Sequence, residues 1–137
     1  MVIRFEPLQE RLLRADANRR RVYVAKVQTT YDAWAAGQIP LSRLCRDAGD
    51  ALQDYASETL DALVGCANGS RDTEEPAPWV LDAYDEGISR AGIAMRDTIA
   101  DSTARHAVAQ TLQERTLRAE SQLRQVIDLS HAAGPQR

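Results

Sequence analysis

The chain has 137 residues, a formal net charge of −3, an isoelectric point near 5.4 and only seven aromatic residues. This length suits one domain of roughly 100 to 200 residues, and the acidic balance excludes the broad basic field that sequence-independent nucleic-acid binding needs. The apolar residues are mainly alanine and leucine, a composition that favours helices over sheets.

The first residues and the cysteines indicate where the protein acts. Arg4 and Glu6 interrupt the apolar run that a secretory signal would need, and no apolar run reaches the ~18 residues of a membrane span. Cys45 and Cys66 are 21 residues apart on or beside one predicted helix. They would lie ~30 Å apart, too far for a disulfide. We therefore expect a cytoplasmic protein with no membrane partner.

The first predicted helix begins at Pro7, because the missing N–H of proline costs nothing at the first helical position. It continues to Trp34 without a breaker. Gly37 can adopt the left-handed cap of a helix and Pro40 follows it, so this stretch predicts a turn into a second helix. The two helices together form a predicted hairpin over residues 6–64.

The second helix has a clear apolar face, because its apolar residues recur every three or four positions. That face consists of Leu41, Leu44, Cys45, Ala48, Leu52, Tyr55, Ala56, Thr59, Leu60 and Leu63. Residues 65–78 are rich in glycine and proline, so we predict that they form a loop between two hairpins.

A second hairpin is predicted over residues 79–131, followed by a frayed tail at 132–137. Asp101 and Ser102 are good N-caps, so we favour a break between two helices there. The alternative is one helix of 50-odd residues, which would be ~80 Å long and awkward in a small domain. The predicted core positions of this half are Trp79, Val80, Ala83, Tyr84, Ile88, Ala91, Met95, Ala109, Leu112, Thr116, Ala119, Leu123 and Val126.

The patterns together predict an all-α fold, a bundle of four or five helices built from two antiparallel hairpins and forming a single domain over residues 1–137. Gly87 and Gly92 weaken the third helix, but such small residues can also admit a close neighbour.

Charge is unevenly distributed along the chain. Residues 1–26 have a balance of +4, residues 27–104 a balance of −9 and residues 105–137 a balance of +2. The acids of the second helix step by threes and fours and so form one stripe: Asp47, Asp50, Asp54, Glu58 and Asp61.

The stretch Asn18–Arg21 raises the question of what its three consecutive arginines face. If the first two helices fold back about Gln38, Arg21 lies level with Tyr55. In the same register, Arg14 lies level with Ala62.

This register predicts a charged seam between the first two helices. Arg19–Arg21 would meet Asp54 and Glu58 across it, and Arg14 would meet Asp61. Three consecutive residues point around a helix, so at least one arginine is left for solvent or a partner.

The sequence offers few groups for catalysis. Only two histidines occur, and no metal-binding or nucleotide-binding motif is found. Cys45 and His106 could in principle pair, but Cys45 belongs to an apolar stripe, where cysteine is usually a small core residue. Asp82, Asp85 and Glu86 could offer oxygens to a metal, yet acids in the first turns of a solvated helix are far commoner. We expect a non-enzymatic protein without cofactor or metal.

The remaining interpretation is a protein-binding regulator or inhibitor that docks through its acidic central segment on a larger protein with a basic surface, for instance one that handles nucleic acid. Phage- or plasmid-borne inhibitors, anti-CRISPR proteins among them, immunity proteins and secretion chaperones fit this description. Aromatic residues such as Tyr31, Trp34 and Trp79 are expected to pack near the bundle ends. The alternative is that Trp79 and Tyr84 form an interface anchor ringed by acids, as aromatic residues often do at protein contacts. The candidate partner-binding residues are Asp72, Glu74, Glu75, Trp79, Asp82, Tyr84, Asp85 and Glu86.

Two alternative functions stay open. A nucleic-acid-binding helical protein would use the arginine-rich first helix, and a small-molecule-binding bundle or enzyme would need a polar cavity. The heptad-like spacing of the last helix also fits a homodimer. The candidate nucleic-acid-binding residues are Arg11, Arg14, Arg19, Arg20 and Arg21.

Overall fold

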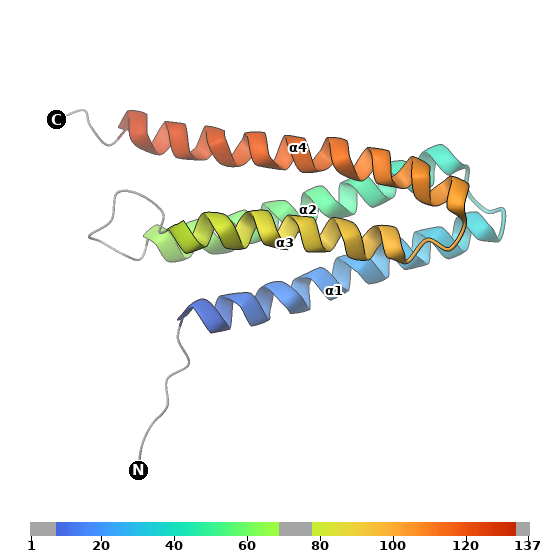
Figure 1. Cartoon of the computed structure of the whole chain (residues 1–137), viewed down its shortest axis with the longest axis horizontal. Coiled ribbons are helices and arrows are strands. Elements are labelled where there is room, and N and C mark those ends of the chain that lie inside the picture. The colour runs from blue at the N-terminus through green and yellow to red at the C-terminus, as the bar shows by residue number, and fades with distance from the viewer. Residues whose placement is uncertain (1–7, 69–77, 134–137) are drawn as a thin grey trace, which may run out of the picture.

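The computed structural model describes residues 8–68 and 78–133, with side chains described for 10–62 and 82–125. Every regular element in this part of the chain is an α-helix, which confirms the all-α fold class (Figure 1). Consecutive helices run in opposite directions along the long axis of the molecule. The four helices are α1 (Leu8–Ala35), α2 (Leu41–Asn68), α3 (Pro78–Asp97) and α4 (Ser102–Ala133).

The helices form a four-helix bundle in which, among the described residues, one diagonal pair of helices is in contact and the other is not. Helices α2 and α3 contact each other across the bundle, and each also contacts α1 and α4. Within the described residues, α1 and α4 make no contact. The order around the bundle is therefore α1, α2, α4, α3, so that the neighbours α1 and α3 run in the same direction.

The turn between α1 and α2 forms where glycine and proline predict it. Gly37 adopts a positive φ of 75°, and the Gln38 N–H donates to the Ala33 carbonyl at 2.9 Å. This is the glycine cap that closes a helix by satisfying one of its last carbonyls. The backbone N–H groups of Arg43 and Leu44 then donate to the Pro40 carbonyl, which starts α2.

The predicted break at Asp101 is also confirmed, so α3 and α4 are separate helices. The Asp101 Oδ2 atom accepts a hydrogen bond from the Ala104 N–H at 2.8 Å, which is the N-cap interaction. The Asp101 N–H donates to the hydroxyl of Tyr31 at 3.0 Å and ties this turn to the end of α1. Tyr31 itself stacks on Trp34, as expected for aromatic residues at a bundle end.

The hydrophobic core is drawn mainly from α2, α3 and α4. Among the side chains of α1 that the structure describes, only Tyr23 and Val27 belong to the fully buried apolar residues. The predicted stripe of α2 is confirmed by the buried positions Leu44, Ala48, Leu52, Tyr55, Ala56 and Thr59. In α3 and α4 the structure buries Tyr84, Ile88, Ala91, Met95, Leu112 and Ala119 as predicted, and it adds Ala104 and Val108.

Two glycines lie where neighbouring helices come close. A Cβ atom at Gly49 would stand 2.9 Å from the Thr111 methyl group of α4, and one at Gly87 would stand 2.6 Å from the Tyr55 hydroxyl oxygen of α2. Gly87 thus admits a close neighbour, as predicted, whereas Gly92 faces open space. None of the helices in the described part of the chain combines the length and the hydropathy that crossing a bilayer requires.

Candidate functional site

The most unusual feature of the bundle is a carboxylate on the inner face of α1. Asp16 is 9% exposed and lies where α1, α2 and α3 meet. A buried charge costs free energy unless it is paired and hydrogen-bonded. We therefore expect Asp16 to have both ion-pair and hydrogen-bond partners.

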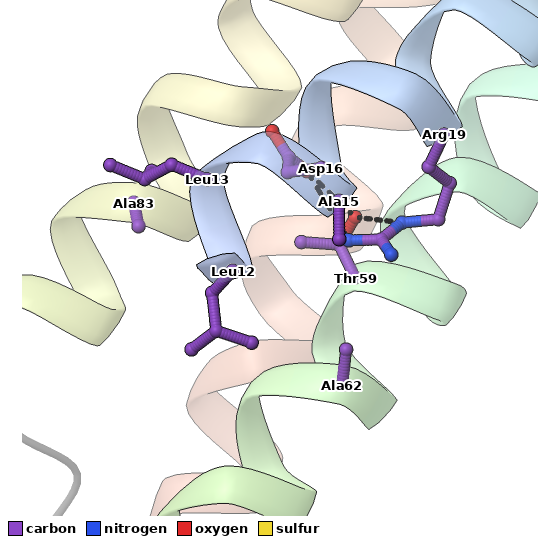
Figure 2. Close-up of a pocket in the computed structure, with 8 residues that line it drawn as sticks. All are labelled: Leu12, Leu13, Ala15, Asp16, Arg19, Thr59, Ala62 and Ala83. Carbon is purple, nitrogen blue, oxygen red and sulfur yellow. Dashed lines mark hydrogen bonds and ion pairs between the residues drawn. The ribbon is translucent and has the colours of Figure 1, made fainter. Parts of the chain in front are cut away.

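Helix α2 supplies two hydroxyl groups to Asp16. The Tyr55 hydroxyl donates to Asp16 Oδ1 at 2.5 Å, and the Thr59 hydroxyl lies 3.3 Å from the same oxygen. Thr59 in turn accepts a hydrogen bond from Arg19 Nε at 3.2 Å (Figure 2). The four residues form one connected chain of hydrogen bonds between the two helices.

Helix α1 supplies the positive charge. Arg20 Nη1 lies 2.9 Å from Asp16 Oδ2, and Arg19 Nη2 lies 3.4 Å from Oδ1. Both arginine side chains are less than one-fifth exposed, so solvent screens these pairs less than it screens an ordinary surface pair. We call Asp16, Arg19, Arg20, Tyr55 and Thr59 the Asp16 cluster.

Burial and the Asp16 carboxylate both hold the Tyr55 hydroxyl in its neutral form. Removal from water raises the pKa of Tyr55 above its ordinary value, and the hydrogen bond to Asp16 and the charge of that residue raise it further. Gly87 of α3 leaves the space that this pair occupies, because any side chain there would meet the Tyr55 hydroxyl. The cluster is therefore a fixed donor–acceptor arrangement, with no buried side-chain polar atom left without a partner in the described region.

The Asp16 cluster answers the question raised by the three consecutive arginines. Arg19 and Arg20 pair with Asp16 of their own helix, one turn earlier. Arg21 is exposed and donates to the Asn18 side chain at 2.6 Å. The predicted seam is wrong for these arginines, since none of the three forms an ion pair with Asp54, Glu58 or Asp61 where side chains are described.

The predicted register between α1 and α2 agrees with the structure, although the predicted ion pairs of the three consecutive arginines across it do not form. Contacts of Asp16 and Arg19 with Thr59, and of Tyr23 with Tyr55, fall where folding about Gln38 places them. A guanidinium group can reach a carboxylate three or four residues earlier on its own helix as well as one across a helix pair. The buried Asp16 carboxylate attracts the arginines more strongly than the exposed acids of α2 because solvent screens it less.

The acids of α2 consequently divide into two groups. Asp47 lies within 4 Å of Arg43 and Arg46, and Asp50 lies 2.8 Å from Arg115 of α4. The other three acids, Asp54, Glu58 and Asp61, are exposed and have no ion pair with any cation in the described side chains.

One of these exposed acids does contact α1. Glu58 accepts a hydrogen bond from the Tyr23 hydroxyl. The pKa of Tyr23 is raised to about 12 by burial, by this hydrogen bond and by the charges of Glu58 and Asp54. The contact leaves the carboxylate charge of Glu58 in place.

The candidate partner-binding residues lie in different environments. Asp82, Asp85 and Glu86 are exposed on α3, and Glu86 pairs with Arg90 one turn later. Tyr84 is 1% exposed and its hydroxyl donates to the Ala119 carbonyl at 3.1 Å, so it belongs to the core and offers no surface to a partner. Three acids and one side chain of the set lie outside the described residues: Asp72, Glu74, Glu75 and the indole of Trp79.

The candidate nucleic-acid-binding residues do not form one free surface. Arg19 and Arg20 are turned into the Asp16 cluster, where their charge is offset by a carboxylate. Arg11, Arg14 and Arg21 are exposed on α1.

The cavities lined by described residues include one small cavity and one open groove near α1 and α2. The cavity beside Asp16 has a volume of about 20 Å³, which is room for one water molecule. Figure 2 shows the apolar side chains of Leu12 and Leu13 on the wall opposite the Arg19 guanidinium. A wider open groove of about 390 Å³ runs between α1 and α2, where Lys26 faces Asp54 and the other acids at that level.

The groups considered for chemistry do not converge in the described part of the chain. His106 is exposed, and its ring lies 3.4 Å from the Gln110 side chain, whereas Cys45 is half-buried against the core. No group of three or more histidine, cysteine, aspartate or glutamate side chains within the described ranges has the proximity needed to hold a metal ion.

Sequence reasoning missed Asp16, although a signal for it exists. Leu12, Asp16, Tyr23 and Val27 are separated by whole helical turns and lie on the same face of α1. A charged residue in a stripe of core positions indicates a buried polar contact.

Comparisons with protein-family models, with curated proteins and with solved structures gave no match to the chain.

Proposed function

We propose that this chain is a non-enzymatic, protein-binding regulator or inhibitor that docks on the basic surface of a larger protein. The docking surface is the row of carboxylates Asp54, Glu58 and Asp61, which we call the α2 acidic face. We further propose that it acts in the cytoplasm, and that its architectural units are the two helical hairpins α1–α2 and α3–α4.

The observation that carries this proposal is that no ion pair with a cation neutralises Asp54, Glu58 or Asp61 among the side chains that the structure describes. The nearest arginines of α1 are held by Asp16, so they do not neutralise the three carboxylates. Residues 54 to 61 span about 10 Å of helix at 1.5 Å per residue, close enough for the charges to act on one partner surface. Like-signed charges in a row raise the rate of association with a surface of opposite sign.

The exposed acids of α3 offer a second surface for the same proposal. Asp82 and Asp85 have no ion pair with a cation in the described side chains, while Glu86 is partly offset by Arg90. Their spacing of three residues puts Asp82 and Asp85 on one side of α3.

The test is affinity capture from the native host, with identification of the proteins retained. We expect the wild-type chain to retain a specific protein and the variant Asp54→Asn/Glu58→Gln/Asp61→Asn to lose it. A matched control is Asp32→Asn/Asp97→Asn/Glu114→Gln, which changes the net charge by the same amount at scattered exposed positions. Equal capture by the wild type and both variants would refute the α2 acidic face as the docking surface.

Nucleic-acid binding is the competing function, and a salt titration separates the two. The exposed arginines Arg11 and Arg21 are the residues that support it. If short DNA or RNA bound the chain with an affinity that fell steeply with salt and with the variant Arg11→Gln/Arg21→Gln, the competing function would replace our proposal.

A further inference from the structure

The outer face formed by α3 and α4 exposes apolar side chains that the bundle does not use. Ile93 of α3 is 48% exposed and Leu117 of α4 is 60% exposed. A shallow groove of about 370 Å³ runs between the two helices, and Gly92 and Ile93 are among the residues that line it. Leu117 follows the groove residue Thr116 and lies one turn from Gln113. A Cβ atom at Gly92 would meet nothing within 4 Å, so the groove is open at this position.

The charges that line this groove are separated by sign. The hydrogen bond from Tyr84 to Ala119 sets the start of α3 beside the middle of α4, so Asp85 and Glu120 lie at the same end. Arg96 lines the opposite end. Arg96 is eleven positions after Asp85 on the helix, a distance of about 16 Å.

A groove with acids at one end and a base at the other is complementary to itself. When two copies face each other antiparallel about a two-fold axis, the acidic end of each groove meets the basic end of the other. Asp85 and Glu120 would then approach Arg96 of the second copy, and symmetry would make this contact twice. Ile93 lies between the charged ends and would be covered with Leu117.

We propose that the α3–α4 face, which exposes Ile93 and Leu117, is the contact between two copies of this chain in an antiparallel homodimer.

The local pairing of these charges leaves them available for such a contact. Asp85 and Glu120 have no ion pair with a cation in the described side chains. Arg96 lies 3.5 Å from its neighbour Asp97, and both side chains are largely exposed, so this pair contributes little.

The size of the face sets the expected strength of the dimer. Two helices about 10 Å apart, each about 10 Å wide and about 30 Å long, present a face about 20 Å by 30 Å, or roughly 600 Å² per copy, below the ~800 Å² of a standard interface. A dimer of this size is expected to form at concentrations on the order of micromolar rather than nanomolar. The contact is independent of the α2 acidic face, because it uses the opposite pair of helices.

The test is the molar mass in solution, measured by sedimentation over protein concentrations from about 1 μM to 1 mM. We expect the wild-type chain to pass from monomer to dimer in that range. The variants Ile93→Arg and Leu117→Arg should raise the dissociation constant at least about tenfold. The controls are Leu13→Arg and Val22→Arg, which put the same charge at exposed apolar positions of α1 and should leave the dimer unchanged.

A charge exchange tests the antiparallel geometry. In a Glu120→Gln background, which removes the second acid, Asp85→Arg should weaken the dimer by bringing two bases together, and adding Arg96→Asp should restore it, because the exchange renews the Asp85–Arg96 contact at both symmetric positions. Circular dichroism of each variant confirms that the fold is kept. A wild-type chain that stays monomeric throughout the range, controls that weaken the dimer as much as Ile93→Arg, or a charge exchange that fails to restore the dimer would overturn the proposal.

Discussion

The two main contacts of α2 are built on different principles. Toward α1, helix α2 presents the hydroxyls of Tyr55 and Thr59 to the buried carboxylate of Asp16. Toward α4, it presents Gly49, whose lack of a side chain lets Thr111 and Arg115 approach the backbone. The α1–α2 contact is a satisfied polar network, and the α2–α4 contact is a close steric fit with Arg115 reaching Asp50 at its edge.

This difference predicts how each contact fails. A polar network loses more than one interaction when a single member is removed, because the other groups remain buried without a partner. A steric fit responds mainly to changes in volume. Substitutions that separate these responses are the most direct test of the comparison, and they follow from the largest expected effect to the smallest.

The largest effect is expected from Leu52, which is fully buried on the helix shared by both contacts. Leu52→Ala should lower the free energy of unfolding by about 3 kcal/mol, since it removes buried apolar area and leaves a cavity. Urea unfolding followed by circular dichroism measures the loss. The exposed control Leu117→Ala should change the unfolding free energy by less than about 0.5 kcal/mol when measured on the monomer. Similar losses for both variants would contradict the assigned core.

The Asp16 cluster should show strong non-additivity. Tyr55→Phe leaves the Asp16 carboxylate without its shortest hydrogen bond and should cost about 2 kcal/mol, as should Asp16→Leu, which leaves the Tyr55 hydroxyl without an acceptor. The double variant should lose about 1 to 2 kcal/mol less than the sum of the two. Unfolding free energies of all four proteins give this coupling directly. Strict additivity would show that the two groups act independently.

A glycine series distinguishes the contacts by space alone. Gly87→Ala should lower the unfolding free energy by about 2 kcal/mol, because its methyl group would overlap the Tyr55 hydroxyl. Gly49→Ala should cost about 1 kcal/mol, since the Arg115 side chain it meets can move. Gly92→Ala meets nothing and should stabilise the monomer by about 0.5 to 1 kcal/mol through helix propensity. Thermal melts rank the three, and any other order would contradict the assigned close approaches.

The smallest effect is expected at alkaline pH, from the contact of α3 with α4. Burial, followed by the charges of Asp85 and Glu120, raises the pKa of Tyr84 from 10.0 to about 12. A raised pKa means that the folded state keeps its proton more tightly, so this stability is present below pH 10 and is lost as the pH rises toward 12. The loss due to Tyr84 should reach about 1 kcal/mol at pH 11.

The variant Tyr84→Phe isolates this contribution. Unfolding free energies at pH 9 and pH 11 should differ less in Tyr84→Phe than in the wild type. Tyr23→Phe is the matched variant at the α1–α2 contact, because the pKa of Tyr23 is also raised to about 12. A wild-type stability that does not fall between these two pH values would contradict the burial of both tyrosine hydroxyls.

The local features of the fold could be predicted from the sequence because they depend on residues close together in the chain. Gly37 ends α1 through its own backbone freedom, and Asp101 starts α4 through a bond to Ala104 three residues later. The apolar stripe of α2 likewise follows from helical periodicity, which fixes the buried face before any partner helix is known.

Only the tertiary structure decided which acid each arginine pairs with. Arg19 and Arg20 have acids within reach both on α1 and across it, and helical spacing alone does not rank these partners. The choice depends on burial: packing against Tyr55 and beside Gly87 takes Asp16 out of water, and a poorly solvated carboxylate binds the guanidinium groups more strongly than an exposed one. The tertiary structure also decided between the two roles that the sequence allowed for Tyr84, as a core residue or as a partner-binding residue, because residues of α4 that are distant in sequence cover it.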